Sequence, residues 1–286
     1  MILNKIKTFD QIFGILKDPR SHSVRSKNYP RLSKAIQSYV ARTGLRGGGN
    51  GRVEMGFFGS VRMPFTRMGS VTSLDLFGLD ELLLFLFYWK NRHRFRRAVD
   101  IGANLGLHSI LMARCGWKVT SFEPDSRHCR LLRRNLKING IKSVTVQEAA
   151  VSKCNGRGEF VRVVGNTTSS HLVGAKTGAY GKLKKVSVRL VSATQAIKSA
   201  DFVKIDAEGH EWEIIKSMPI NKWKNFCCVI EVGNKENAKQ IYKFCKKNKI
   251  PFFPQKIFWK PGQCFFDMPK SYKEGSVFLA KNPHFK

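Results

Sequence analysis

The chain has 286 residues, and 42% of them are hydrophobic, so it is long enough to bury a full core and too apolar to be globally disordered. Its 51 basic residues outnumber its 20 acidic residues, and the net charge of +31 favours polyanionic partners such as nucleic acid or an anionic membrane surface. The longest apolar run, at 82–89, is far shorter than the roughly 20 residues of a membrane-spanning helix.

The seven cysteines contain no C-x-x-C pair, which argues against a zinc finger and favours reduced thiols. The N-terminal residues lack the pattern of a secretory signal. We therefore expect no metal site and a cytoplasmic location, with peripheral attachment to an anionic membrane as a second possibility.

Residues 1–50 are expected to form a basic, helical N-terminal arm. Its apolar residues near one helix face are Ile2, Ile6, Phe9, Ile12, Phe13 and Leu16. RGGGNG at 46–51 indicates a linker. Residues 51–96 are expected to form a short hairpin that turns at Gly59–Ser60, followed by a helix at 78–95 that leads into the core.

From 97 to 286, strand and helix patterns alternate, which predicts an α/β domain with a doubly wound, mostly parallel sheet and helices on both faces. The predicted strands are 98–102, 118–124, 143–151, 201–209 and 226–233, with closing strands at 251–259 and 275–281. The predicted helices are 105–116, 126–140, 210–218 and 236–249. Further strands at 158–164 and 184–191 flank a polar loop at 165–174, which is either a substrate lid or a plain hairpin loop.

The stretch AVDIGANLGLHS, at 98–109, predicts a tight strand-to-helix turn. A dinucleotide site usually shows G-x-G-x-x-G, in which the middle glycine lets the backbone approach a pyrophosphate. Here Gly102 and Gly106 are the only glycines, and Asn104 lies near the point of close approach. The sequence of this turn therefore does not indicate a site for the two phosphates of a dinucleotide.

Ligands of such sheets bind at the carboxyl ends of the strands, where this chain concentrates its few acidic residues. Glu123 follows Gly102 by the spacing that places a carboxylate on a ribose diol. A nucleoside with an amino-acid tail and a cationic sulfonium fits these features, and we identify it as S-adenosylmethionine. The expected cofactor-binding residues are Asp100, Gly102, Asn104, Gly106, Glu123, Pro124, Glu148, Ala149 and Asp206.

Four blocks of this sequence resemble FkbM-type methyltransferases, and the resemblance extends over roughly 75–233. The blocks are VDIGANLGLHS, FEPD, EAAVS and, most specifically, VKIDAEGHEWEII. The resemblance implies a class I methyltransferase fold with a Rossmann-like, seven-stranded sheet, and methyl transfer to hydroxyl oxygens of sugars or secondary metabolites. One departure is that Val232, Gly233 and Asn234 follow Glu231, where such proteins often have a histidine.

Methyl transfer to oxygen requires an aligned acceptor and removal of its proton. Asp206, at the end of the fourth strand, is the best candidate base or hydroxyl orienter. Glu208, Glu231 and His210 are further catalytic candidates, although Glu208 and His210 also fit a charged first turn of a helix.

The sequence favours an O-methyltransferase that acts on a glycan, lipid-linked glycan, glycolipid or related hydroxyl compound. The charge leaves open an RNA 2′-O-methyltransferase, or an inactive methyltransferase-like protein that binds nucleic acid. The RNA alternative ranks second because the fifth strand ends in Glu231 rather than a lysine and Lys204 is expected to point back along its own strand, so that the set of lysines and acids used in such chemistry does not assemble.

Overall fold

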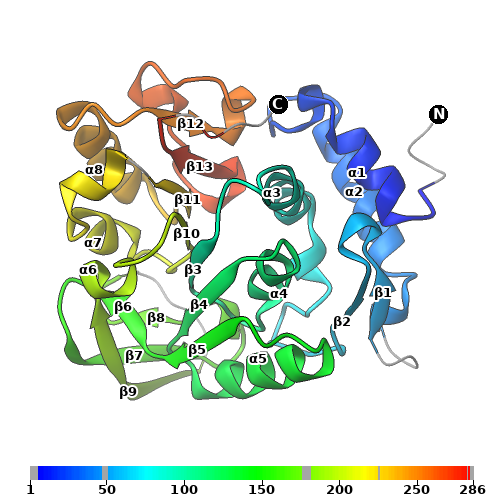
Figure 1. Cartoon of the computed structure of the whole chain (residues 1–286), viewed down its shortest axis with the longest axis horizontal. Coiled ribbons are helices and arrows are strands. Elements are labelled where there is room, and N and C mark those ends of the chain that lie inside the picture. Colours follow the sequence, from blue (N-terminus) through cyan, green and yellow to red (C-terminus); the bar gives the residue numbers. More distant parts are fainter. Residues whose placement is uncertain (1–5, 47–50, 176–181, 225, 282, 284–286) are drawn as a thin grey trace.

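A seven-stranded, mainly parallel sheet forms the centre of the computed structural model, which describes residues 6–46, 51–175, 182–224, 226–281 and 283 (Figure 1). The strand order is β12–β13–β11–β10–β3–β4–β5, and β13 runs antiparallel to both of its neighbours. This arrangement confirms the predicted class I methyltransferase fold. The strands are β3 (Arg97–Ile101), β4 (Lys118–Glu123), β5 (Val144–Glu148), β10 (Phe202–Ile205), β11 (Cys227–Glu231), β12 (Phe252–Pro254) and β13 (Ser276–Leu279).

Helices cover both faces of the sheet, so its central strands are apolar on both sides. In β10, Phe202 packs into the core on the side of α3, while its neighbour Val203 packs into the core on the side of α7 and α8. The first face carries α3 (Leu79–Lys90), α4 (Leu107–Arg114) and α5 (Ser126–Ile138), and the second carries α6 (Ala193–Ala196), α7 (Glu211–Lys216) and α8 (Lys235–Lys247).

A second, four-stranded sheet lies beside β4 and β5, at the lower left of Figure 1. Its order is β6 (Ala150–Ser152), β9 (Leu183–Ser192), β7 (Gly156–Val163) and β8 (His171–Leu172). The single strand predicted at 143–151 is therefore wrong, because the chain leaves the main sheet at Ala149 and continues in the second sheet. Ala149 and β6 are buried, so the apolar pattern continues through the break.

The N-terminal residues pack as an outer layer against α3 and share its hydrophobic core (Figure 1). They form α1 (Phe9–Leu16), α2 (Tyr29–Val40) and a hairpin of β1 (Arg52–Glu54) and β2 (Ser60–Arg62). The hairpin turn occupies residues 55–59 rather than Gly59–Ser60, because Gly56 and Gly59 both have positive φ and Ser60 already pairs with Glu54. Ile2 and most of the predicted 46–51 linker lie outside the described residues. Within the described parts, no helix combines the length and apolar character needed to cross a membrane.

Candidate functional site

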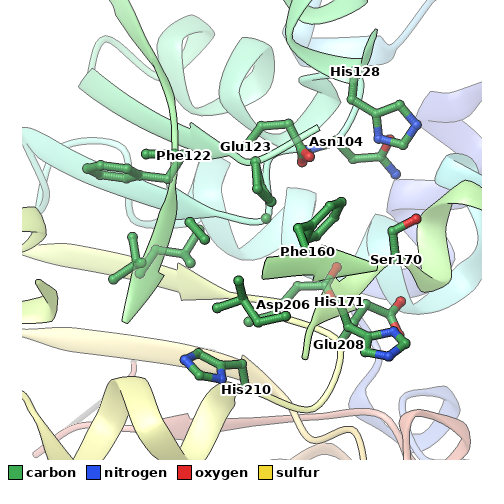
Figure 2. A pocket seen from close by; sticks show the side chains of 18 of the residues that line it. Asn104, Phe122, Glu123, His128, Phe160, Ser170, His171, Asp206, Glu208 and His210 are labelled. Atoms are coloured by element: carbon green, nitrogen blue, oxygen red, sulfur yellow. The ribbon is translucent and has the colours of Figure 1, made fainter. Parts of the chain in front are cut away.

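A cavity opens at the carboxyl ends of β3, β4 and β10, and it is closed on one side by the second sheet. Figure 2 shows Glu123 and Asn104 on one side of it and Asp206 and His210 on the other. The cavity brings together eight of the residues that the sequence singled out. These are Gly102, Asn104, Glu123, Pro124, Ala149, Asp206, Glu208 and His210.

The turn after β3 reaches the end of β10 because residue 102 is a glycine. Gly102 has φ +79°, and a Cβ on it would lie 1.8 Å from the carbonyl oxygen of Asp206. Asn104 also adopts a left-handed conformation, with φ 49°, which asparagine tolerates better than most residues. Its Oδ1 is buried and has no hydrogen-bond partner among the residues that the structure describes, and Asn104 lines the cavity, so it offers an acceptor for a ligand.

Glu123 ends β4 and is 5% exposed. The backbone N–H groups of Asn104 and Asp125 each donate to one of its carboxylate oxygens, both at 2.8 Å. Burial raises the pKa of Glu123 to about 7, and the carboxylates of Asp125 and Asp100 add to the rise. The two N–H bonds fix the orientation of a carboxylate that can accept hydrogen bonds from a vicinal diol.

Asp206 and Lys204 form a charged pair at the end of β10. Lys204 Nζ lies 3.4 Å from Asp206 Oδ2 and 3.7 Å from Asp100 Oδ1. Burial by itself lowers the pKa of Lys204, but these carboxylates raise it above its ordinary value. The expectation that Lys204 points back along its own strand is wrong, because its Nζ lies beside Asp206, two positions further along the chain and just after the end of β10.

The loop after β10 is held by Glu211, which the sequence analysis did not select. Glu211 is 1% exposed, and its carboxylate accepts N–H bonds from Ala207 and Gly209 and a side-chain bond from Asn237. These contacts bring Glu208, with φ 49°, to the cavity wall. His210 Nε2 lies 3.0 Å from Ser152 Oγ, and burial lowers the pKa of His210, so it is neutral at pH 7.

The other four selected residues lie outside the cavity lining. Asp100 is fully buried and accepts a 2.6 Å hydrogen bond from Ser109. Gly106 begins α4, where a Cβ would lie 2.8 Å from the Leu132 side chain. Glu148 is exposed and pairs with Arg133. Glu231 lies at the end of β11, the strand beside β10, and burial together with Asp206 raises its pKa well above the ordinary value.

The second sheet and its loop supply the remaining wall. The sequence predicted the strands at 158–164 and 184–191 and left the loop at 165–174 open as a substrate lid or a plain hairpin loop. In Figure 2, Phe160 lies between Glu123 and Asp206, and Ser170 and His171 lie to the right of them along the cavity wall. His128 on α5 also lines the cavity, and its Nε2 lies 3.0 Å from Thr167 Oγ1 in this loop. Only the polar composition of 165–174 signalled this role. Within the described residues, no group of three or more His, Cys, Asp or Glu side chains is arranged to hold a metal ion.

The sequence matches the methyltransferase FkbM domain over residues 100–252, just over half of the chain. A comparison with curated proteins found no match. Among solved structures, precorrin-6y C5,15-methyltransferase from Geobacter metallireducens is 13% identical, with a TM-score of 0.40 over 70% of this chain and 88% of that chain. The N-terminal domain of human METTL16 is 13% identical, with a TM-score of 0.43 over 94% and 93%. An O-methyltransferase from Bacillus cereus in complex with SAH is 12% identical, with a TM-score of 0.36 over 69% and 80%.

Proposed function

The chain belongs to the FkbM methyltransferase family and is an S-adenosylmethionine-dependent methyltransferase, and we propose that it methylates a hydroxyl oxygen of a glycan, glycolipid or related small molecule. Asp206 carries this proposal. Its carboxylate is 31% exposed, lines the cavity and is held by Lys204 at the turn formed by Gly102. A carboxylate in this position can accept the proton of an acceptor hydroxyl or orient it.

The residues of the cavity fit S-adenosylmethionine. Glu123 offers a fixed carboxylate for the ribose diol, and Asn104 offers a buried oxygen that has no partner within the described part of the chain. Ala149, Val151, Phe160 and Leu172 supply an apolar surface suited to a nucleobase. When bound, this cofactor supplies a methyl group on a positively charged sulfur. The chain's own residues then have to align the acceptor oxygen with that methyl group and remove its proton.

An RNA 2′-O-methyltransferase is the second candidate, and the Lys204–Asp206 pair favours it. Such chemistry commonly combines lysines with acids to orient a ribose hydroxyl, and the net charge of +31 suits a polyanionic substrate. Lys204 is only 5% exposed, however, and it is paired with two carboxylates. This burial favours a role in holding Asp206 over direct contact with phosphate, so we rank the glycan-type acceptor first.

Transfer of a tritiated methyl group to separated glycan, lipid and RNA fractions of the source cell tests both candidates. We expect label in the glycan or lipid fraction, and label confined to RNA would overturn the first proposal. Asp206→Asn should reduce turnover by about 100-fold or more while S-adenosylhomocysteine affinity changes little, because the loss of a base affects mainly the chemical step. Glu54→Gln removes a 66% exposed carboxylate on β1 and serves as the control. Full turnover by the Asp206 variant would exclude Asp206 as the base.

We also propose that the basic surface draws this enzyme to polyanions in the cytoplasm, including an anionic membrane surface that carries lipid-linked acceptors. The support is the net charge of +31. Sedimentation with vesicles that contain anionic lipid should decrease steeply as salt is raised, and neutral vesicles should not bind. Equal binding to both kinds of vesicle would exclude an electrostatic origin.

A further inference from the structure

A buried ion pair joins the second sheet to the edge of the cavity. Arg162 on β7 donates from Nε to Asp125 Oδ2 at 2.6 Å and from Nη2 to Asp125 Oδ1 at 2.7 Å. The two side chains are 8% and 1% exposed. Two parallel bonds from one guanidinium fix both the position and the orientation of the carboxylate.

Asp125 also makes two local contacts, one with the first turn of α5 and one with Glu123. Its Oδ1 accepts the N–H of Arg127 at 2.8 Å and caps α5, while its own backbone N–H donates to Glu123 Oε1 at 2.8 Å. Arg162 therefore fixes Asp125, and the backbone N–H of Asp125 in turn binds one oxygen of the Glu123 carboxylate. Arg162 and Asp125 are 37 positions apart in the sequence, so no local sequence pattern predicts their ion pair.

Arg162 also balances a charge beside Glu123. Burial by itself raises the pKa of Asp125, but the bonds from Arg162 and Arg127 lower it, so Asp125 is ionised. Without Arg162, that negative charge would face Glu123 uncompensated. Within the described residues, the titratable groups around Glu123 come from every neighbouring element. They are Asp100 on β3, Glu148 at the paired position of β5, Asp125 before α5, His128 and Cys129 on α5, and, across the cavity, His171 on β8 and Asp206, Glu208 and His210 after β10.

We propose that Arg162 is a positioning residue for the cofactor, which fixes and neutralises Asp125 so that Glu123 is held as an oriented carboxylate for the ribose diol. This proposal rests on the proposed function, because it requires the cofactor to bind at Glu123. It also assigns the second sheet a role in cofactor binding beyond forming the cavity wall.

The proposal differs from a purely structural anchor in how S-adenosylhomocysteine affinity depends on pH. An anchor that only holds β7 in place would weaken binding equally at every pH. If Arg162 instead balances the charge of Asp125, a substitution at either residue should change the pH midpoint of S-adenosylhomocysteine binding. The two substitutions should change this midpoint in opposite directions. Arg162→Gln leaves Asp125 negative and should raise the midpoint by about one pH unit, whereas Asp125→Asn should lower it.

Calorimetric titration with S-adenosylhomocysteine between pH 5.5 and 8.5 measures both effects. We expect Arg162→Gln to weaken binding about tenfold or more at pH 7, and Arg162→Lys, which keeps the charge but loses the paired bonds, to weaken it less and keep the wild-type midpoint. Thermal melts establish that each variant is folded. If Arg162→Gln does not fold, Asp125→Asn and Arg162→Lys provide the midpoints.

Two outcomes would overturn the proposal, and Glu123→Gln distinguishes them. If Arg162→Gln and Asp125→Asn both keep the wild-type midpoint while Glu123→Gln binds one to two orders of magnitude more weakly, Arg162 has no positioning role but the cofactor site stands. If Glu123→Gln also binds with wild-type affinity, the cofactor does not use Glu123, and the cofactor site in the proposed function fails together with this inference.

Discussion

Lowering the pH is expected to weaken cofactor binding through Glu123. The buried carboxyl has a pKa of about 7, and protonation removes both its charge and one acceptor for the ribose diol. If binding requires the ionised form, the apparent affinity decreases as the ionised fraction decreases. Between pH 8 and pH 6 that fraction changes from about nine-tenths to about one-tenth, so S-adenosylhomocysteine should bind about tenfold more weakly at pH 6, a difference of about 1.4 kcal/mol.

Isothermal titration of S-adenosylhomocysteine across this pH range, with wild type and Glu123→Gln, is the appropriate assay. Because His128, His171 and His210 also line the cavity, the comparison between the two proteins isolates the contribution of Glu123. Glu123→Gln should bind more weakly at pH 8 by one to two orders of magnitude, roughly the loss of a charge-assisted contact, and with a much flatter pH profile. A flat wild-type profile from pH 6 to pH 8 would refute the reasoning.

The same pKa predicts an opposite effect on the stability of the cofactor-free protein. Between the ordinary pKa of 4.5 and about 7, the folded protein binds more protons at Glu123 than the unfolded chain does, so this contribution to stability is lost as the pH rises through about 7. Ionised Glu123 costs about 3 kcal/mol relative to its ordinary environment. Glu123→Gln removes this cost but also loses one of the two backbone hydrogen bonds to the side chain, which offsets part of the gain. The free energy of unfolding of Glu123→Gln at pH 8, measured in urea, should therefore exceed that of the wild type by roughly 1–2 kcal/mol. A less stable variant at pH 8 would contradict this account.

Two further predictions concern the backbone turn and the N-terminal layer. Gly102→Ala should destabilise the protein by about 2 kcal/mol or more in urea unfolding, through left-handed strain and collision with the Asp206 carbonyl. Gly116→Ala also has positive φ but nothing within 4 Å, so equal losses in the two variants would exclude the collision. His22 contacts the Leu16 carbonyl at 2.7 Å and accepts the Trp259 indole N–H at 3.0 Å, which requires a neutral ring. Burial lowers its pKa, so its contribution to stability should be lost as the pH falls below 6.5, and an equally steep loss in His22→Gln would assign the effect elsewhere.

Much of the fold follows from local sequence patterns. Strand patterns predicted the seven strands of the main sheet, and the helices predicted at 105–116 and 126–140 correspond to α4 and α5, because strand burial and helix periodicity depend on residues close together in the chain. The spacing of Gly102 and Glu123 directed attention to the edge of the sheet that holds the cavity.

Tertiary structure decided the features that depend on partners distant in the sequence. Residues 143–151 read as one strand, yet they serve two sheets. β5 is only partly buried, whereas Ala149 and β6 are buried, and the sequence pattern does not identify the neighbouring strand of either. Lys204 was expected to point back along its own strand, whereas the packing of β10 beside β3 places its Nζ between the carboxylates of Asp100 and Asp206. The pairing of Arg162 with Asp125 arises only when the second sheet packs against α5, since the charge of an arginine in the sequence does not reveal which buried carboxylate it meets.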